Sequence, residues 1–311
     1  MSDLRHAEYT QYIDPGEKRL GLTTKDEQAC CRWFGAEGYT GRGAIVEWGA
    51  WLGSLTSNYC DGLRVNADRP RGSVAYAYDL FRWEQWCEDE VRGTEHAGRL
   101  RVGESFADYF ALLYDRYRDF LVVRAADLSQ ERWHDGPIEL IVNDAVKTLP
   151  IGKGAYANFT PALLPGIGLI ANQDYLWPTD SFISVVHFVM RDFFAHEYTV
   201  PDSCMVIFRC VREPDVACLS PLPDELAAMD RALLDEAFAW SRQTVAVSPI
   251  EIIDLGKAVT LWQAGWKEDA WRVVRDRRLS EKRGNVVYDF QLDVLHQWGF
   301  GSLLSVGSSR P

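Results

Sequence analysis

The sequence lacks the features that mark several common classes of protein. Its seven cysteines show no C-x-x-C spacing, so neither a zinc site nor a disulfide framework is indicated. The longest apolar stretch, residues 182–190, is far shorter than the roughly 20 residues that span a bilayer. The amino terminus is charged and has no apolar segment of the kind that directs secretion. These absences predict a cytoplasmic protein with reduced cysteines and no membrane partner.

Basic residues are scarce relative to acidic ones. The 33 Lys and Arg residues against 45 Asp and Glu residues give a formal net charge of −12. Because proteins bind nucleic acids mainly by neutralising phosphates, this balance predicts that nucleic acid is not a partner. The length of 311 residues fits either two domains or one large α/β unit, and both are long enough to bury a core without disulfides.

Short apolar runs alternate with helical patterns along the first two thirds of the chain. The runs that are typical of buried strands are residues 44–48, 73–79, 120–127, 138–144 and 166–174. Helical patterns such as residues 105–120 lie between them. This alternation predicts an α/β fold with a doubly wound, mostly parallel, Rossmann-like sheet and helices on both faces.

The remaining segments define the expected organisation around this sheet. A helix that begins near Thr23 precedes the first strand. A helix over residues 180–197 is followed by two apolar runs, 204–211 and 216–220, which we expect to form a closing hairpin. We therefore predict a helical lead-in over 1–40, a sheet domain over 41–220 and a helical extension over 221–311.

Acidic residues stand at the ends of four successive predicted strands: Glu47, Asp79, Asp127 and Asp144. In a parallel sheet these ends meet at one edge, where ligands bind. The first acid opens an E-x-G-x-x-x-G turn with Gly49 and Gly53, whose glycines allow a ligand to approach the backbone. A single strand-end Asp is as readily the N-cap of the next helix, so the prediction of a site depends on the four acids together.

Two well-known phosphate-binding motifs are missing. The chain has neither the nicotinamide fingerprint G-x-G-x-x-G nor a phosphate loop ending in Gly-Lys-Ser/Thr. An acid in the first turn would repel a pyrophosphate, whereas it suits a ligand that carries an amine. A nicotinamide or nucleotide-sugar enzyme is thus disfavoured but stays open, as does a non-catalytic binding protein that keeps the fold.

With these motifs the chain resembles the class I S-adenosylmethionine-dependent methyltransferases, particularly the macrocin O-methyltransferase type. The resemblance covers about residues 41–220 and includes the E-x-G-x-x-x-G turn, YAYDLF, RAAD, the fourth strand's acid and PGIGLIANQDY. It implies a seven-stranded sheet whose last two strands form an antiparallel hairpin. It also implies methyl transfer to an oxygen of a small molecule, such as a sugar-bearing natural product or a phenolic compound.

The same resemblance implies roles for the strand-end residues. Glu47 and the backbone of Gly49, in the turn that Gly53 closes, would face the methionine part of S-adenosylmethionine. Asp79 would bind the ribose. The adenine would be held by Ala126 and Asp127, and the transfer site would be bordered by Asp144.

A methyl acceptor must lose its proton, and the sequence offers a metal and a base for this step. Asp144 and Asp174 could hold a divalent ion such as magnesium, although the set of acids found in metal-dependent relatives is incomplete. Lys147 lies three residues after Asp144, where catechol-type relatives carry their base, and His187 is a second candidate. An exposed lysine and a core histidine are the structural alternatives. We expect the metal-free case, with Lys147 as the base.

Aromatic residues complete the predicted site and its partners. Four tryptophans adjoin the expected edge and could stack on a flat acceptor: Trp48, Trp51, Trp83 and Trp177. Aromatic stripes in the carboxy-terminal helices predict a partial lid or a contact in a homo-oligomer. The expected partner is otherwise the small-molecule methyl acceptor alone.

Overall fold

The computed structural model describes residues 6–13, 21–281 and 284–304, and a seven-stranded sheet forms its centre. The strand order is β3-β2-β1-β4-β5-β7-β6, and β7 runs antiparallel to both its neighbours while the other pairs are parallel. The strands are β1 (Ala44–Trp48), β2 (Ala75–Asp79), β3 (Leu121–Ala125), β4 (Ile138–Asn143), β5 (Leu169–Asn172), β6 (Phe194–Thr199) and β7 (Val206–Cys210). The predicted doubly wound, mostly parallel sheet is confirmed.

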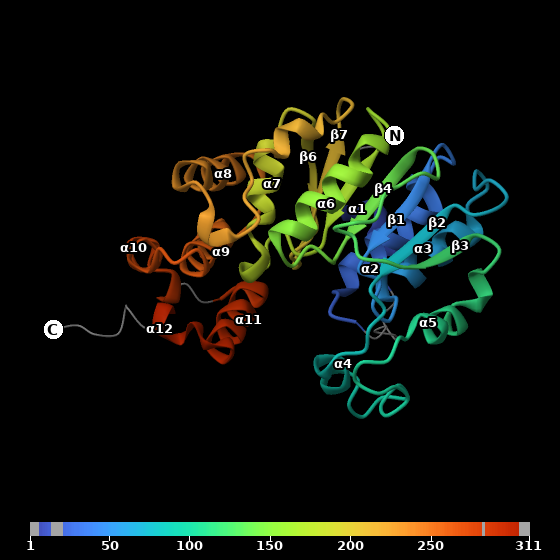
Figure 1. Cartoon of the computed structure of the whole chain (residues 1–311), viewed down its shortest axis with the longest axis horizontal. Coiled ribbons are helices and arrows are strands. Elements are labelled where there is room, and N and C mark those ends of the chain that lie inside the picture. Colours follow the sequence, from blue (N-terminus) through green and yellow to red (C-terminus); the bar gives the residue numbers. More distant parts are fainter. Residues whose placement is uncertain (1–5, 14–20, 282–283, 305–311) are drawn as a thin grey trace.

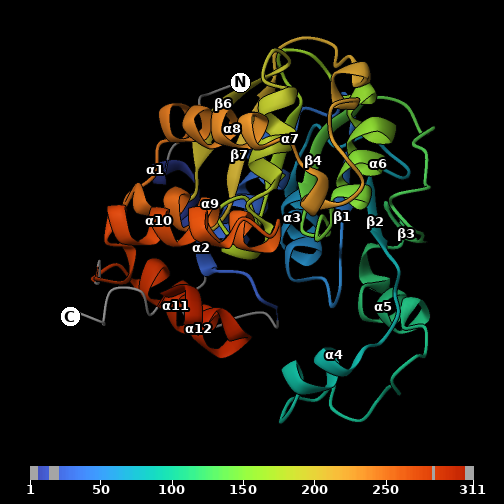
Figure 2. The same ribbon diagram turned by 60° about the vertical axis from the view of Figure 1, so that its left-hand side comes forward.

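Helices cover both faces of the sheet (Figures 1 and 2). Those before the last strand are α1 (His6–Tyr9), α2 (Lys25–Trp33), α3 (Ser54–Val65), α4 (Gln85–Glu90), α5 (Ala107–Leu113), α6 (Leu149–Phe159) and α7 (Ile183–Val189). The predicted carboxy-terminal helices follow as α8 (Arg231–Thr244), α9 (Glu251–Gln263), α10 (Lys267–Arg277), α11 (Val286–Leu295) and α12 (Gly301–Leu304). None of the helices in the described ranges is long and apolar enough to cross a membrane.

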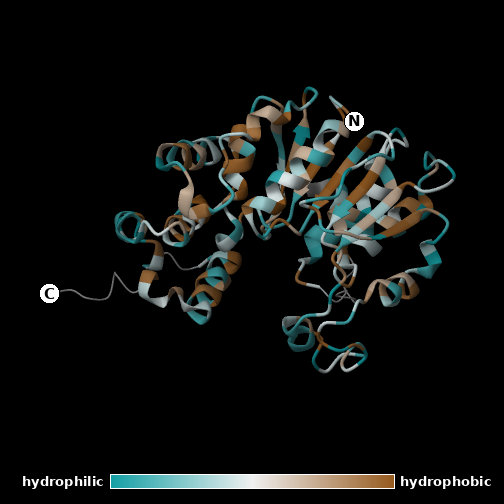
Figure 3. Cartoon of the chain, viewed as in Figure 1, coloured by the Kyte–Doolittle hydropathy of each residue, from teal (hydrophilic) through white to brown (hydrophobic). Residues whose placement is uncertain are grey.

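Two hydrophobic cores lie on opposite faces of the sheet. In β1 all five residues are buried, and they alternate between the cores: Val46 and Trp48 belong to one, Ile45 to the other. This is the pattern expected of a central parallel strand, and the hydrophobic colouring of the strands in Figure 3 follows from it. The core that contains Val46 extends to Leu234 and Val259, so the carboxy-terminal helices pack in one continuous core with the sheet.

The prediction that residues 204–211 and 216–220 pair as a closing hairpin is wrong. Residues 216–219 form a 3-10 helix, and β7 instead pairs with β6, which occupies the end of the segment predicted as a helix. The chain turns between them at Asp202, whose φ is 48°, and Val200 donates a backbone hydrogen bond to Met205 at 3.0 Å. β6 lies at the edge of the sheet and carries His196 and Glu197, so it lacks the continuous apolar run of a central strand.

Two predicted helices illustrate the role of local signals. The first is α2, whose N-cap is Thr24 rather than Thr23, with a capping box that Glu27 completes. The second, predicted over 105–120, is shorter: α5 is followed by a separate 3-10 turn at Asp115–Tyr117.

Figure 1 shows α4 and α11 below the carboxyl edge of the parallel strands, with α11 to the left of α4.

Candidate active site

The tip of β1 holds Glu47 in a buried position. Its carboxylate accepts hydrogen bonds from the hydroxyls of Thr56 and of Tyr59 (3.0 Å), both on α3. Burial raises the pKa of Glu47 to about 7, although the two hydroxyls oppose that shift. Near neutral pH this carboxyl group is therefore only partly ionised, and a nearby cation would favour its charged form.

The turn after Glu47 depends on its two glycines. Gly49 has φ +83° and Gly53 has φ +77°, a backbone region that favours glycine. A Cβ on Gly49 would lie 2.8 Å from the Cβ of Ala145, so this position also lets the turn pack against the loop after β4. At Gly53 a Cβ would meet the ring of Tyr114, which covers the start of α3. The predicted glycines thus shape the turn at the edge of the sheet.

Asp79, at the tip of β2, connects two loops through its carboxylate. One oxygen accepts from the backbone N–H of Trp51 at 2.9 Å, and the other accepts from that of Phe81 at 2.7 Å. Both donor residues have positive φ, 40° for Trp51 and 48° for Phe81, a strained region for bulky side chains. Asp79 therefore stabilises the conformation of the β1 and β2 turns in addition to any contact with a ligand.

The tip of β3 is more exposed. Ala126 donates its backbone N–H to the carbonyl of Asp79 at 2.9 Å, which places it beside the β2 tip. Asp127 accepts from the backbone N–H of Ser129 at 2.9 Å and from its hydroxyl at 2.7 Å. Asp127 thus has the local turn-forming role that a strand-end Asp often takes, and its exposed side chain leaves room for a second role.

At the tips of β4 and β5 three carboxylates surround one lysine. The amino group of Lys147 contacts Asp174 closely, and it lies 3.5 Å from Asp144 and from Asp180. Burial by itself would lower the pKa of Lys147, but the three carboxylates outweigh it and raise that pKa. An amino group held as an ammonium does not remove a proton, so this arrangement does not fit the expected role of Lys147 as the base.

The space between Asp144 and Asp174 is filled by donors. Besides Lys147, the amide nitrogen of Gln173 lies 3.1 Å from Asp144 and 2.7 Å from Asp174 in the orientation that satisfies both ends of the amide. Within the described ranges no group of three His, Cys, Asp or Glu side chains is arranged to hold a metal ion. Magnesium binding by Asp144 and Asp174 stays a prediction, and in this arrangement it would require Lys147 to move.

His187 lies inside the core. Its Nε2 is 2.9 Å from both the hydroxyl of Tyr156 and the amide nitrogen of Asn172, and its ring stacks on Phe208 with centroids 4.1 Å apart. Burial lowers its pKa to about 3. The side chain has no exposed surface, so its geometry matches the structural alternative and gives the predicted catalytic role no support. Through Asn172, which accepts from Asn143 at 2.8 Å, the network fixes the tips of β4 and β5.

Two acidic residues at this edge were not predicted: Asp180, which contacts Lys147, and Glu27. Glu27, on α2, is 1% exposed, and burial raises its pKa to about 7. One of its oxygens accepts from the backbone N–H of Thr24 at 2.7 Å, and the other is buried without a hydrogen-bond partner. Burial is the main cause that raises the pKa of Asp144, and the charge of Glu27 adds to that rise, so α2 lies close to the strand tips. The sequence signal at this position was that of a capping box, which gave no indication of a site.

The tryptophans predicted near the edge divide into two groups. Trp48 and Trp83 are fully buried and belong to the cores. Trp51 is partly exposed and packs on Trp86 of α4, with ring centroids 5.2 Å apart. Trp177 is also partly exposed, and it lies in the turn after β5. Two of the four thus have surface that a ligand could contact.

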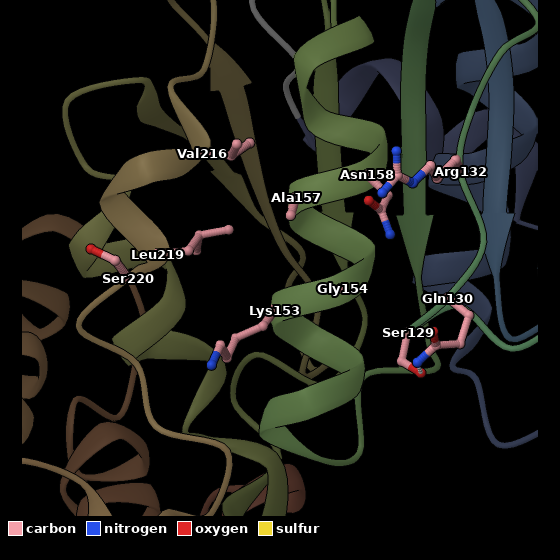
Figure 4. Close-up of a pocket in the computed structure, with 10 residues that line it drawn as sticks. All are labelled: Ser129, Gln130, Arg132, Lys153, Gly154, Ala157, Asn158, Val216, Leu219 and Ser220. Atoms are coloured by element: carbon pink, nitrogen blue, oxygen red, sulfur yellow. Dashed lines mark hydrogen bonds between the residues drawn. The ribbon is translucent and has the colours of Figure 1, made fainter.

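A groove of about 420 Å³ lies elsewhere, along the outer face of α6 (Figure 4). It is lined by residues that include Ser129, Lys153 and Leu219, and Lys153 pairs with Asp224 at 2.6 Å. None of the strand-tip acids lines this groove. The candidate site is therefore the carboxyl edge of the sheet and not this groove.

Comparison with protein-family models and with curated proteins gave no match. Among solved structures, the TDP-rhamnose 3'-O-methyltransferase CalS11 of calicheamicin biosynthesis is similar at 17% identity and a TM-score of 0.39, over 54% of this chain and 72% of that one. An SAM-dependent O-methyltransferase from Thermotoga maritima is similar at 11% identity and a TM-score of 0.38, over 64% and 69%. The pyocyanin biosynthetic protein PhzM is similar at 14% identity and a TM-score of 0.34, over 58% and 54%. Likeness at this level carries no argument about substrate or activity.

Proposed function

We propose that this protein is an S-adenosylmethionine-dependent methyltransferase that methylates an oxygen of a small molecule. The observation that carries the proposal is a surplus of carboxylates at the carboxyl edge of the sheet. Asp144, Asp174 and Asp180 all lie within 3.5 Å of the amino group of Lys147, and Glu47 and Glu27 are near enough to Asp144 to add to the rise in its pKa that burial causes. Buried like charges are costly without a compensating cation. A ligand that carries an amine and a sulfonium would supply that positive charge.

The strand-tip turns have the features that such a ligand requires. The Gly49 turn lets a ligand approach the backbone, and the amino end of α3 points toward the same edge. Glu47 lies beneath this turn as an acceptor for an amine. We infer that Asp79, at the tip of β2, would bind the ribose with the lone pairs that its backbone donors, which include Trp51 and Phe81, leave unused.

The reaction itself asks little of the protein beyond alignment and proton removal. When bound, the cofactor supplies a methyl group on a positively charged sulfur, which the acceptor oxygen displaces in line. Lys147 holds Asp174 and Asp180 in place as an ammonium. We infer that the proton of the acceptor hydroxyl passes to a carboxylate of this group rather than to Lys147.

Calorimetric titration with S-adenosylhomocysteine tests the cofactor assignment. We expect binding to the purified chain and no binding of NAD under the same conditions. Failure to bind S-adenosylhomocysteine would overturn the proposal. Methyl transfer from labelled S-adenosylmethionine to a panel of hydroxylated acceptors then separates an enzyme from a protein that only binds the cofactor.

A further inference from the structure

An aromatic surface adjoins the carboxylate group and is not used by the proposed cofactor contacts. Trp177 meets two side chains of the carboxy-terminal extension: Phe290, with ring centroids 6.1 Å apart, and Trp298, with centroids 5.8 Å apart. The rings are inclined by 43° and 72°, so they do not stack flat on one another. We call these three residues the aromatic trio.

The trio keeps an unusual amount of apolar surface in contact with solvent. Phe290 is 58% exposed and Trp298 is 56% exposed, although both lie beside a well-buried helix face. That face, which includes Tyr288, Leu292 and Leu295, packs in the core. α11 can therefore be anchored without Phe290 or Trp298, which remain available to cover an apolar ligand.

The trio is fixed beside the groups that would take part in the reaction. In the sequence Trp177 stands between Asp174 and Asp180, and both of these acids pair with Lys147. Gln291 of α11 is fully buried and donates to the carbonyl of Leu176 at 2.9 Å. Because Gln291 is adjacent to Phe290, this hydrogen bond joins the aromatic surface to the turn that contains the acids.

Charge narrows the kind of ligand that the trio can accept. The nearby strand tips carry the surplus of carboxylates around Lys147, and two of these acids, Asp174 and Asp180, flank Trp177 in the sequence. An anionic group would be repelled here, whereas a neutral or cationic one would not. The inclined aromatic rings suit a planar ring, by stacking and edge contacts.

We propose that the trio of Trp177, Phe290 and Trp298 binds the methyl acceptor, and that this acceptor is an aromatic compound without negative charge. The inference rests on the proposed function, because the acceptor's hydroxyl would lie toward the carboxylates of Asp174 and Asp180. It assigns the carboxy-terminal extension a direct role in substrate recognition. It also excludes acceptors that carry phosphate or carboxylate groups.

The test compares matched probes on the full chain, with and without S-adenosylhomocysteine. Dopamine is an aromatic cation, and 3,4-dihydroxyphenylacetate has the same catechol ring with a negative charge. We expect dopamine to bind at least about tenfold more tightly by calorimetry. Equal or tighter binding of the anion would overturn the charge assignment, and the absence of dopamine binding at millimolar concentration would overturn the proposal.

Variants locate the binding surface. Phe290→Ala and Trp298→Ala should each weaken dopamine binding by about three- to tenfold, and Trp298→Phe should retain most of the affinity. Trp271→Ala is the matched control, because Trp271 is a 36% exposed tryptophan on α10 that packs on Trp262. It should leave the affinity unchanged. Unchanged dopamine affinity in both alanine variants of the trio would place the acceptor elsewhere.

Two further measurements distinguish an acceptor site from a cofactor contact and from a subunit contact. Titration of S-adenosylhomocysteine into the same variants should give the wild-type affinity. If the wild-type chain does not bind S-adenosylhomocysteine, the proposed function fails, while the dopamine titrations still decide whether the trio binds aromatic compounds. If Trp298→Ala dissociates an oligomer in sedimentation and leaves dopamine affinity unchanged, the trio is a subunit contact and the proposal is overturned.

Discussion

The carboxylate of Asp79 accepts the backbone N–H of Trp51 at 2.9 Å, which ties the turn after β1 to the tip of β2. Because the second oxygen accepts from Phe81, one side chain stabilises two turns whose donors both have positive φ. A residue in this position influences a bound ligand in two ways. It can contact the ligand directly, and it fixes the backbone against which the ligand would lie.

Asp79→Asn is therefore expected to weaken binding of S-adenosylhomocysteine by about ten- to a hundredfold, as loss of a charge-assisted hydrogen-bond pair would. The measurement is calorimetric titration. Asp215→Asn serves as a control, since Asp215 is exposed and accepts the backbone N–H of Ala217 within its own turn at 3.0 Å. Wild-type affinity in Asp79→Asn would show that Asp79 has no part in the cofactor site.

The raised pKa of Glu47 predicts pH-dependent cofactor binding. Burial raises this pKa to about 7, so the carboxylate becomes ionised as the pH passes through neutrality, while the amine of S-adenosylhomocysteine stays protonated. Affinity should increase about five- to tenfold between about pH 6 and 8. Glu47→Gln should remove most of this dependence. A wild-type affinity that is flat over this range would contradict an interaction between Glu47 and the amine.

The sequence predicted the parallel strands well and the antiparallel edge strand β6 poorly. Continuous apolar runs identify strands that are buried on both faces, so β1 was predicted with its observed bounds, and β2, β4 and β5 were predicted to within a few residues. β3 is the other edge strand and is only partly buried, but its apolar residues Leu121, Val122 and Val123 still form such a run. β6 was missed because an edge strand carries polar residues such as Glu197, which interrupt the apolar run.

At the candidate site, residues at strand ends could likewise be predicted, whereas residues positioned by tertiary packing could not. Glu47, Asp79 and Asp144 could be predicted because a regular fold brings consecutive strand ends to one edge. Glu27 and Trp298 could not, since their positions depend on how α2 and the segment after α11 dock, and local sequence patterns do not determine that packing. Lys147 was also a candidate from the sequence, but the pKa of its amino group depends on Asp174, Asp144 and Asp180 together, and the contacts with Asp174 and Asp180 are tertiary ones.

Buried Glu27 predicts a change of stability with pH. Its pKa is raised to about 7 in the folded chain, so between about pH 5 and 7 the folded state retains a proton that the unfolded state has lost. Stability should therefore fall as the pH rises through this window, and Glu27 should contribute about 3 kcal/mol to the loss. Glu27→Gln retains an acceptor for the capping box and should raise the thermal midpoint above neutral pH while leaving it nearly unchanged at pH 5.

Glu27→Ala provides the contrast for that experiment. It removes the buried charge together with the hydrogen bond from Thr24, so the gain above neutral pH should be reduced by the cost of a lost cap, about 0.5–2 kcal/mol. If Glu27→Gln destabilises the chain equally at every pH, the side chain is not the titrating group.

The final prediction concerns the ammonium between the acids. Lys147→Met leaves Asp144, Asp174 and Asp180 together without their shared cation, and it should lower the free energy of unfolding at neutral pH. We expect a loss of about 1–3 kcal/mol by denaturant titration, less than for a fully buried pair because Lys147 is 48% exposed. The double variant Lys147→Met/Asp174→Asn should recover part of the loss, because one of the repelling charges is then absent.

The same variant distinguishes the ammonium from a metal. If Lys147 and Gln173 are the groups that bridge Asp144 and Asp174, a chelator should leave the thermal midpoint and the turnover of the wild-type chain unchanged. Added magnesium should then stabilise Lys147→Met more than wild type, because removal of the amino group frees the oxygens that magnesium prefers. Loss of wild-type turnover on chelation, with recovery on addition of magnesium, would show instead that the ion displaces the amino group of Lys147 from the carboxylates.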